Sequence, residues 1–459
     1  MTRPEPITKS KVAKIIGPGQ ARYATVAFVD LQGQLRGKTI NAEKLYEGFP
    51  KGVPFAPLNL MLDYGDHTLW PRGYLAPDQD IGDNDCEIDW ARPRTLPFED
   101  AESRAFYFAT FADGTQGSGW DPRKLYRRVE DRANARGLTP VYGLEYEYRL
   151  FAETPQSLRA GHFASPKLVT DTSTYGGVMH QSIWSSFFKA MRDMCDEMNV
   201  PVASMHWEVA AAMGEVALLH RAGITALDDA VLFKTHAKTL ARRHDLTMSF
   251  MARPLEDDDG QSGHMHLSLN NRQGRNAFYS KRATNHMSAI QRYFIGGLQK
   301  LLPDWLLLFA PNINSFKRFV PGIFAPTAAT WGIENRTTAI RVLEGGPGAQ
   351  RIEFRVPGSD SNPYLVAAGV LAAGLAGIER KIEPGEPVVG SAYQQKTPSA
   401  LAFPNSFEQA IERFHKSTHA REWFGDDFVE MFAGTRRAQA DAFARMVSNR
   451  ELQRFLELA

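Results

Sequence analysis

Residues 143–148 read GLEYEY, inside the longer run VYGLEYEYRLF (141–151) of mostly aromatic and aliphatic residues. Such residues predict a strand. Alternate side chains of a strand share a face, so Glu145 and Glu147 point the same way and lie close together. Burial and mutual repulsion both oppose this arrangement of two carboxylates. The stretch therefore predicts either a solvent-exposed face or a cavity that binds cations.

The same pattern recurs in three more predicted strands. His264 and His266 are two residues apart in GHMHLSL, and His206 and Glu208 are two apart in MHWEVA, with Glu215 seven residues further on. Arg351, Glu353 and Arg355 alternate with apolar residues in AQRIEFRV. One such strand could be a solvent-exposed edge. Four of them, each with an apolar face to pack against helices, favour one cavity lined by the charged faces.

The order of predicted elements indicates an α+β protein of more than one domain. A hairpin is expected at 22–40, and the small polar stretch ADGTQGSGWDPR (112–123) is typical of a domain joint. Strands and amphipathic helices follow, which predicts an antiparallel or mixed sheet backed by helices. We expect an N-terminal domain over 1–112 and a catalytic domain over 113–459.

The composition is that of an ordinary soluble protein. The 459 residues include 53 basic and 52 acidic side chains, a net charge of +1, which gives no reason to expect nucleic acid or an anionic membrane as a partner. Two cysteines are too few for a disulfide framework. Without an apolar signal segment or a membrane-length apolar run, the expected location is the cytoplasm.

The residue types in the predicted cavity favour a particular chemistry. Glutamate and histidine with almost no cysteine are suited to hard divalent ions, Mg²⁺ or Mn²⁺. Arg351 and Arg355 flank Glu353, and guanidinium groups match carboxylate and phosphate oxygens. Metal ions and arginines around one pocket favour phosphoryl transfer. A metal-dependent hydrolase or isomerase is the alternative at this point.

The ordered set of motifs resembles the glutamine synthetase family. GLEYEY, HWEVAAAMGE, SGHMHLS, NSFKR, ENRTTAIRV, RIEFRV and SNPYL follow one another over most of the chain. The resemblance implies a small N-terminal β-grasp domain and a larger catalytic domain with a curved antiparallel sheet. It also implies a homo-oligomer, a dodecamer of two stacked hexameric rings, in which a neighbour's β-grasp domain completes each active site.

The resemblance also implies roles for individual residues. The first divalent ion would be held by Glu147, Glu208 and Glu215, and the second by Glu145, His264 and Glu353. Positions near ATP are His206, His266, Arg351 and Arg341. Positions that grip glutamate or the transferring phosphoryl group are Gly260, Arg318, Arg336, Arg341 and Arg355. Alone, each arginine could be a surface ion pair and Gly260 an ordinary turn residue.

The implied activity is an ATP-dependent ligase that joins the γ-carboxyl of L-glutamate to an amine through γ-glutamyl phosphate. Ammonium-using members carry a glutamate six residues past the arginine of NSFKR, where this chain has Phe324. A phenylalanine cannot take a proton, but it can contact an organic group or cation. The sequence thus resembles the γ-glutamylpolyamine and γ-glutamylmonoamine synthetase branch, with roles in amine catabolism and nitrogen metabolism.

Several alternatives remain open. Phe324 could be a packing residue, in which case the chain would be an ordinary ammonium-using glutamine synthetase. A catalytically inactive relative would have broken metal ligands, yet all six positions hold Glu or His. The amine-site aspartate of the N-terminal domain should fall in DQDIGDND, with Asp80 and Asp83 as candidates. Gly358 replaces the acidic residue that usually follows the RIEFR strand in the family.

Overall fold

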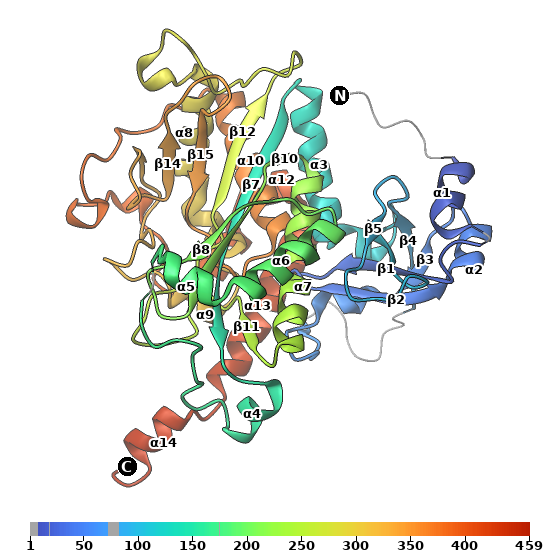
Figure 1. Ribbon diagram of the computed structural model, residues 1–459. Coiled ribbons are helices and arrows are strands. Elements are labelled where there is room, and N and C mark those ends of the chain that lie inside the picture. Colours follow the sequence, from blue (N-terminus) through green and yellow to red (C-terminus); the bar gives the residue numbers. More distant parts are fainter. Residues whose placement is uncertain (1–7, 18, 72–81, 174) are drawn as a thin grey trace.

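A computed structural model of the protein describes residues 8–17, 19–71, 82–173 and 175–459. The chain forms two separate sheets with helices packed around the larger one, which confirms the α+β class (Figure 1). The smaller sheet comes entirely from the first 111 residues. The domain boundary after residue 112 stays a prediction.

The smaller sheet has six strands in the order β2-β1-β6-β4-β3, with β5 paired to β6. β1 and β2 form the hairpin expected at 22–40, whereas β1 and β6 run parallel. The strands are β1 (Tyr23–Val29), β2 (Leu35–Asn41), β3 (Val53–Phe55), β4 (Asn84–Ile88), β5 (Arg94–Thr95) and β6 (Ala105–Phe111).

The larger sheet has nine strands in the order β13-β14-β15-β12-β7-β9-β8, with β10 and β11 also paired to β7. The sheet is mixed, one of the two expected arrangements, because β13 runs parallel to β14 at one edge and the other strand pairs are antiparallel. The strands are β7 (Thr139–Phe151), β8 (Val202–Trp207), β9 (Met213–Leu218), β10 (Arg221–Ala222), β11 (Thr247–Ser249), β12 (Met265–Asn270), β13 (Trp331–Ile333), β14 (Ile340–Leu343) and β15 (Arg351–Phe354).

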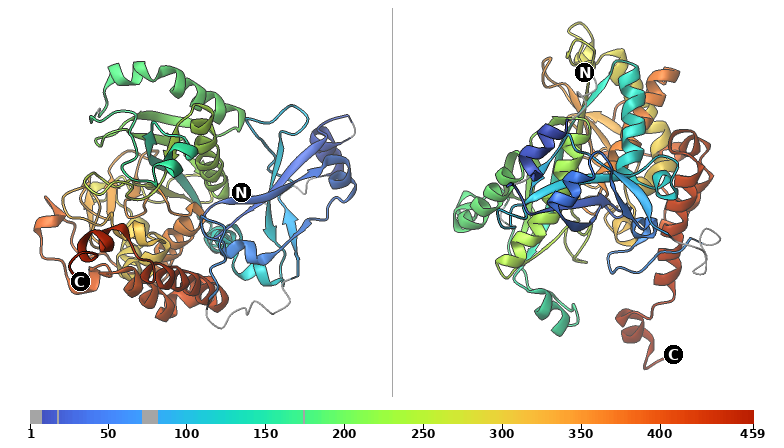
Figure 2. Two further views of the ribbon diagram at one scale, coloured as in Figure 1. Left: turned by 90° about the horizontal axis from the view of Figure 1, so that it is seen from below. Right: turned by 90° about the vertical axis from the view of Figure 1, so that its right-hand side faces the viewer.

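Helices pack around both sheets, with α1 and α2 beside the smaller sheet and α3 and α7 against β7 of the larger one (Figures 1 and 2). The helices are α1 (Lys9–Ile16), α2 (Ala42–Glu47), α3 (Pro122–Ala135), α4 (Pro155–Ala160), α5 (Val178–Ile183), α6 (Ser185–Glu197), α7 (Ile224–Arg243), α8 (Ala289–Trp305), α9 (Ile313–Phe316), α10 (Pro363–Arg380), α11 (Phe407–Lys416), α12 (Thr418–Phe424), α13 (Asp426–Ala444) and α14 (Asn449–Phe455).

The long strand β7 shows why the two faces differ. Tyr142, Leu144, Tyr146 and Tyr148 are buried on its apolar face, and the Tyr146 ring stacks on Phe233 of α7 at 6.4 Å between centroids. The alternate residues, including both glutamates, therefore point away from the helix layer. The period-2 pattern of the sequence is thus sufficient to aim the carboxylates.

The helix layer is held by close packing and by a buried ion network. A side chain at Gly297 of α8 would begin 2.1 Å from the Ala373 carbonyl oxygen of α10, so glycine permits this approach. Between the two sheets, Arg123 of α3 donates to Asp228 of α7 at 2.9 Å and to Asp89, just past β4, at 2.6 Å. Tyr364 of α10 donates to the same Asp228.

The end of the chain stands apart from this core. α14 has no buried residue and projects from the body, as does α4 (Figures 1 and 2). The C-terminal arm, defined here as residues 443–459, exposes Phe443, Met446, Val447, Leu452, Phe455, Leu456 and Leu458. Within the described residues, no helix has the length and hydropathy needed to cross a membrane.

Candidate functional site

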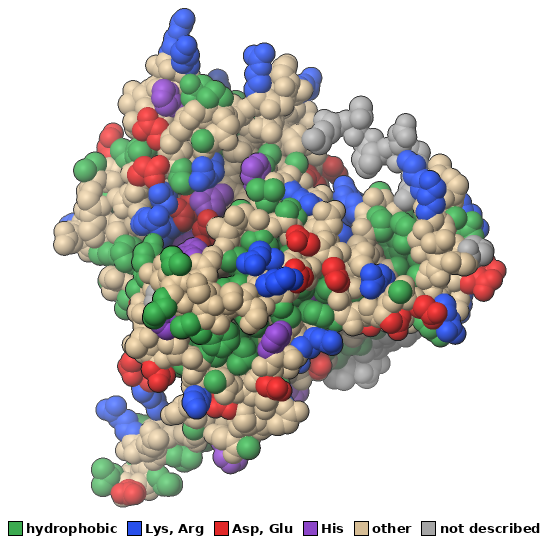
Figure 3. All heavy atoms as spheres, viewed as in Figure 1, with side chains coloured by type: hydrophobic (Ala, Val, Ile, Leu, Met, Phe, Trp, Pro, Cys, Tyr) green, Lys and Arg blue, Asp and Glu red, His purple; other side chains and the backbone are tan. Residues whose placement is uncertain are grey.

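Two rows of polar residues run across the strands of the larger sheet. In one row, Arg341 of β14 is paired with Glu353 of β15, and Glu353 is paired with His266 of β12. In the other, Glu147 of β7 is paired with Glu215 of β9, and Glu215 with His206 of β8. Because paired residues of neighbouring strands point to the same face, the four charged strands line one cavity. Figure 3 shows acidic, basic and histidine side chains gathered there in a hollow.

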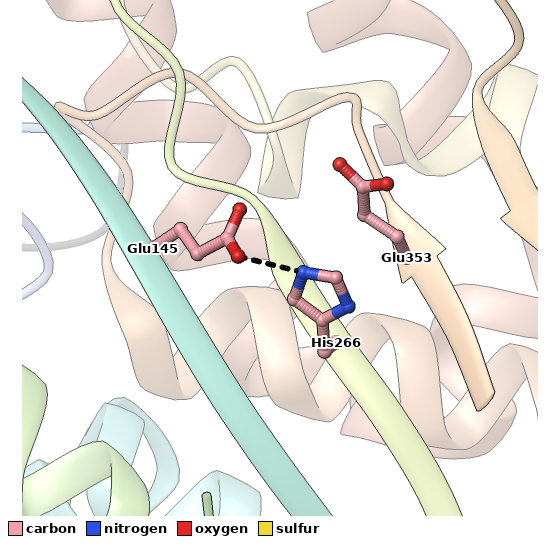
Figure 4. A group of neighbouring side chains, drawn as sticks. All are labelled: Glu145, His266 and Glu353. Atoms are coloured by element: carbon pink, nitrogen blue, oxygen red, sulfur yellow. Dashed lines mark hydrogen bonds and ion pairs between the residues drawn. The ribbon is translucent and has the colours of Figure 1, made fainter. Parts of the chain in front are cut away.

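The first cluster combines three neighbouring strands (Figure 4). Glu145, His266 and Glu353 each offer one metal-ligand atom, and these atoms lie within 4.8 Å of one another. His266 Nε2 lies 2.9 Å from Glu145 Oε1, and Arg351 Nε donates to His266 Nδ1 at 3.1 Å. The second bond makes Nδ1 the acceptor, so the proton of a neutral His266 resides on Nε2 and points at Glu145.

Two further clusters extend the first along the cavity. Glu145, Glu215 and His264 form one, and His206, Glu208 and Glu215 form the other. His206 Nε2 lies 2.8 Å from Glu208 Oε1, and His264 Nδ1 lies 3.5 Å from Glu353 Oε1. Because Glu145 and Glu215 are each shared by two clusters, the donors form one continuous chain across the sheet.

The structure brings all six predicted metal ligands to one cavity. Glu208 and Glu215 form a cluster with His206. Glu147 instead accepts a hydrogen bond from the Ser262 backbone N–H, while its backbone oxygen accepts one from Ser359 Oγ at 2.6 Å. Glu147 still lies opposite Glu215 across the β7–β9 pair. The assignment of ligands to individual ions stays a prediction.

The electrostatics of the cavity depend on how close each carboxylate is to a cation. Burial and the charges of the other glutamates raise the pKa of Glu215 to about 9, and burial raises that of Glu147 to about 7. Burial alone would raise the pKa of Glu353, but His264 and Arg355 outweigh it and lower the value to about 2. Hydrogen bonds to His264 and His266 likewise lower the pKa of Glu145. Negative charge is therefore uncompensated around Glu147 and Glu215.

This donor set fits hard divalent ions. Four carboxylates that share three imidazoles at close range match the oxygen and nitrogen ligands that Mg²⁺ and Mn²⁺ accept. The raised pKa values of Glu147 and Glu215 reflect burial and the charges of the neighbouring carboxylates. Bound cations would therefore relieve the repulsion that the packing imposes.

Arginines surround Glu353. Arg355 donates to Glu353 Oε1, and Arg341 donates to Glu353 Oε2 at 3.0 Å and to Glu334. Arg355 Nε also donates to the backbone oxygen of Arg336 at 3.1 Å. The Arg336 side chain itself is exposed. Four of the predicted arginines thus lie at one end of the cavity, beside the cluster of Glu145, His266 and Glu353.

Arg318 lies beneath this arginine group and is fully buried. It donates to Ser262 Oγ at 2.7 Å and to the Val356 backbone oxygen at 2.9 Å. Burial lowers the pKa of its guanidinium to about 10. Gly260 packs directly against it, since a Cβ at Gly260 would lie 2.8 Å from Arg318 Cγ. The predicted substrate residues Arg318 and Gly260 are therefore in contact.

Phe324 is exposed, with 56% of its surface accessible, and has a φ of 56° in the left-handed region. Tyr393 donates to the carbonyl of the next residue, Ala325, at 3.0 Å, and burial raises the pKa of Tyr393. This bond ties the segment of Phe324 to the loop that carries Tyr393.

The predicted amine-site residue Asp83 does not lie at this cavity. Asp83 is exposed and comes one residue before β4, in the smaller sheet (Figure 1). Asp80 lies outside the described residues.

Some site neighbours carry little signal in the sequence. The Tyr175 ring lies 6.5 Å from the His206 ring, and Ser262 links Glu147 to Arg318. Asp360 accepts from Asn312 and Ser315, just before Arg318. None of these residues alternates with apolar positions in a strand, so period-2 analysis does not detect them. Ser262 lies in SGHMHLS, Ser315 in NSFKR, and Asp360 directly before SNPYL, whereas Tyr175 lies in none of the motifs.

Comparisons with known proteins point to one family. Residues 119–455 match the family model described as "Glutamine synthetase, catalytic domain". The chain is 33% identical over 441 residues to the type-1 glutamine synthetase 2 of Dictyostelium discoideum, with 95% of this chain and 84% of that protein covered. It is 32% identical over 464 residues to the gamma-glutamylethanolamide synthetase of Streptomyces coelicolor, with 99% and 97% covered.

A solved structure has the same fold. The structure described as a GmaS/ADP complex superimposes with a TM-score of 0.83 at 23% identity, over 98% of this chain and 99% of that chain. The curved sheet and its helix layer are therefore shared over nearly the whole length.

Proposed function

The chain belongs to the glutamine synthetase family, and on this premise we propose that it is an ATP-dependent ligase that joins the γ-carboxyl of L-glutamate to an organic amine. One observation carries the proposal. Glutamate and histidine donors from β7, β9, β12 and β15 form a continuous chain that ends at a group of arginines around Glu353. A cavity that combines hard-metal ligands with guanidinium groups is equipped for transfer of a phosphoryl group to a carboxylate.

The residues proposed to hold two or more Mg²⁺ or Mn²⁺ ions are Glu145, Glu147, Glu208, Glu215, His264 and Glu353. When bound, these ions would neutralise charge on the phosphates and polarise the phosphoryl oxygens. The protein itself fixes the geometry, since each donor resides on a strand or directly beside one. His206 and His266 add imidazoles at the two ends of the chain of donors.

The arginines are proposed to address the two anionic substrates. Arg351 and Arg341, beside His266 and Glu353, would face the phosphates of ATP. Arg318, Arg336 and Arg355, with the backbone at Gly260, would hold glutamate. Arg341 and Arg355 now bind Glu353. Their guanidinium groups have further donors to offer to an incoming oxyanion, because each carries five N–H groups.

The reaction proposed has two steps. The γ-carboxylate oxygen of glutamate attacks the γ-phosphorus of ATP, the bond from that phosphorus to the bridging oxygen breaks, and γ-glutamyl phosphate and ADP form. The amine nitrogen then attacks the acyl carbon, loses a proton, and phosphate leaves. Arg341 and Arg336 would stabilise the charge that accumulates in these steps. Exclusion of water is needed, because an acyl phosphate hydrolyses readily.

Phe324 supports an organic amine as the nitrogen donor. Its exposed ring, six residues after Arg318, offers an apolar face and a π surface in place of a carboxylate. An organic ammonium with a hydrocarbon part would bind such a surface better than NH₄⁺. The relative from Streptomyces coelicolor is named for an organic amide, and the relative from Dictyostelium discoideum for glutamine. An ammonium-using glutamine synthetase is therefore the second candidate.

The proposed assembly is a dodecamer of two stacked hexameric rings. The exposed apolar residues of the C-terminal arm support self-association, because isolated proteins seldom leave such a segment uncovered. In this assembly Asp83, and Asp80 in the part of the chain not described, would reach a neighbour's cavity and contact the amine. The proposed location is the cytoplasm.

The test is ADP release from Mg²⁺-ATP with glutamate and a panel of amines: ammonium, putrescine, spermidine, ethanolamine, isopropylamine and aniline. Rapid turnover with one organic amine, and little with ammonium, is expected. Mass spectrometry should detect the matching γ-glutamylamide. Turnover with ammonium alone would favour the second candidate. Equal rates with every amine and with none would overturn the ligase proposal.

A further inference from the structure

The short helix α9 is fixed by one carboxylate oxygen that lies outside the chain of metal-ligand donors. Asp360 Oδ2 accepts from Asn312 Nδ2 at 2.8 Å and from Ser315 Oγ at 2.6 Å. Asn312 is the N-cap of α9, and Ser315 forms a capping box with it. Asp360 therefore determines where this four-residue helix begins and how it is oriented.

α9 in turn determines where Arg318 lies. Lys317 ends the helix and Arg318 follows directly, with its side chain buried against Ser262 and Val356. Ser262 also donates to Glu147 through its backbone N–H. A shift of α9 would therefore move Arg318 and change the surroundings of Glu147 together.

The second side of α9 is held by a residue from another segment. Asn314 Nδ2 donates to the Arg253 backbone oxygen at 2.9 Å, and Arg253 donates to the Lys317 backbone oxygen at 2.8 Å. The helix is thus held from two sides, and only the Asp360 side has a charged acceptor.

Gly358 provides the room that Asp360 needs. A Cβ at Gly358 would lie 2.6 Å from Asp360 Oδ1 and 2.9 Å from Ala252 Cβ. Oδ1 is itself buried and has no hydrogen-bond partner. The carboxylate thus occupies the space that a side chain at 358 would take. This relationship accounts for the glycine at a position where the sequence analysis noted the loss of an acidic residue.

We propose that Asp360 is a positioning residue for glutamate binding: it orients α9 so that Arg318 and Gly260 present the pocket that receives glutamate. The proposal rests on the proposed function. It predicts an effect confined to glutamate, because Asp360 reaches the site through α9 and not through the residues proposed to face ATP. If Asp360 had only a structural role, its replacement by alanine would lower the thermal midpoint. It would then change the KM for glutamate and the KM for ATP by the same factor.

The test compares Asp360→Ala, Asp360→Asn and Ser315→Ala with Ser417→Ala, in the full chain with Mg²⁺-ATP and the best amine of the panel. Ser417 matches Ser315 as a control, because it is a buried serine that caps a helix, α12, elsewhere in the fold. The readouts are KM for glutamate, KM for ATP and the thermal midpoint. A second readout is the shift of that midpoint by glutamate in the presence of Mg²⁺-ADP.

Asp360→Ala is expected to raise KM for glutamate about tenfold or more and to leave KM for ATP within about twofold. Asp360→Asn should stay within about threefold of the wild type, since one amide oxygen can accept both bonds. Ser315→Ala should raise the KM for glutamate by a smaller factor. In the double variant with Asp360→Ala, the rise should be smaller than the product of the two single rises. Ser417→Ala should lower the midpoint without changing either KM.

Three results would overturn the proposal. One is that Asp360→Ala and Ser315→Ala raise the KM for glutamate and the KM for ATP by equal factors. Another is that neither variant raises the KM for glutamate. The third is a wild-type protein that shows neither turnover of the substrates nor a shift of the thermal midpoint by glutamate. This result would overturn the proposed function as well. If the wild type shows turnover and the shift by glutamate, and the variants match it in both, only the role of Asp360 is overturned.

Discussion

Glu147 of β7 and Glu215 of β9 lie directly opposite each other across an antiparallel strand pair, and both are buried. Like charges in this relationship destabilise a sheet. The protein keeps them in place although burial and neighbouring charges raise the pKa of Glu215 to about 9. An arrangement that is unfavourable for the protein alone is favourable for a protein that binds divalent cations.

The first prediction uses this relationship. Glu215→Gln should leave the thermal midpoint without metal unchanged or higher, because it removes one of two facing carboxylates. It should also abolish most of the stabilisation by Mg²⁺ or Mn²⁺, which for the wild type is about 2.7 kcal/mol at a metal concentration of 100 Kd. Differential scanning calorimetry with and without metal measures both effects. A variant that loses stability without metal but keeps the full metal shift would contradict the assignment.

The second prediction concerns the choice of amine. Phe324→Glu should raise the ratio of activity with ammonium to activity with the best organic amine by about tenfold or more, because a carboxylate binds NH₄⁺ and takes its proton. Phe163→Glu is the matched control, since Phe163 is also exposed, at 66%, and has a φ of 57°. Steady-state ADP release measures the ratio. An unchanged ratio in Phe324→Glu would mean that another residue forms this wall of the pocket.

The third prediction concerns the buried network between the two sheets. Asp89 forms ion pairs with Arg92, Arg123 and Arg127. Asp89→Asn should destabilise the fold by about 1.5–3 kcal/mol at pH 7, because Arg92 and Arg127 lose their carboxylate and Arg123 keeps only Asp228. Urea denaturation measures the difference. As a control, Asp113→Asn, which removes an exposed partner of Lys124, should have little effect.

The same carboxylate gives a pH dependence with a definite sign. Burial would raise the pKa of Asp89, but the charges of Arg123, Arg127 and Arg92 outweigh it and hold the pKa well below the ordinary value of 3.8. Its stabilisation is therefore fully present above about pH 4 and is lost as the pH falls below that value. The difference in unfolding free energy between wild type and Asp89→Asn should shrink from pH 5 to pH 3. A constant difference would show that this carboxylate does not titrate with a lowered pKa.

The fourth prediction tests self-association. Leu452→Asp combined with Phe455→Asp should shift the assembly to smaller species without lowering the thermal stability of the protomer, since both side chains are exposed in it. Light scattering coupled to size exclusion measures the mass. Val389→Asp, at another exposed apolar position, should leave the mass unchanged. An assembly of full size in the double variant would exclude the C-terminal arm as a contact between copies.

The sequence alone was sufficient to predict to which face of the sheet each strand side chain points. In β7, β12 and β15 the period of two assigns charged and apolar residues to opposite faces, and burial of the apolar face fixes the outcome. The types of donor, the expectation of hard metal ions and the two arginines that flank Glu353 follow from residue chemistry alone. Ordered motifs such as GLEYEY and RIEFRV, too weak one by one, were enough to identify the family.

The tertiary structure decided which donors are neighbours. Glu215 lies opposite Glu147 on one side and opposite His206 on the other, because the register of β9 on β7 and on β8 sets both pairs. Glu147 accepts from Ser262, and Asp360 reaches α9, through loops whose course no local pattern encodes. Local periodicity fixes the face on which a side chain lies, since it depends only on the backbone of one strand. The distance between two side chains depends on long-range packing and register, which arise only when the whole chain has folded.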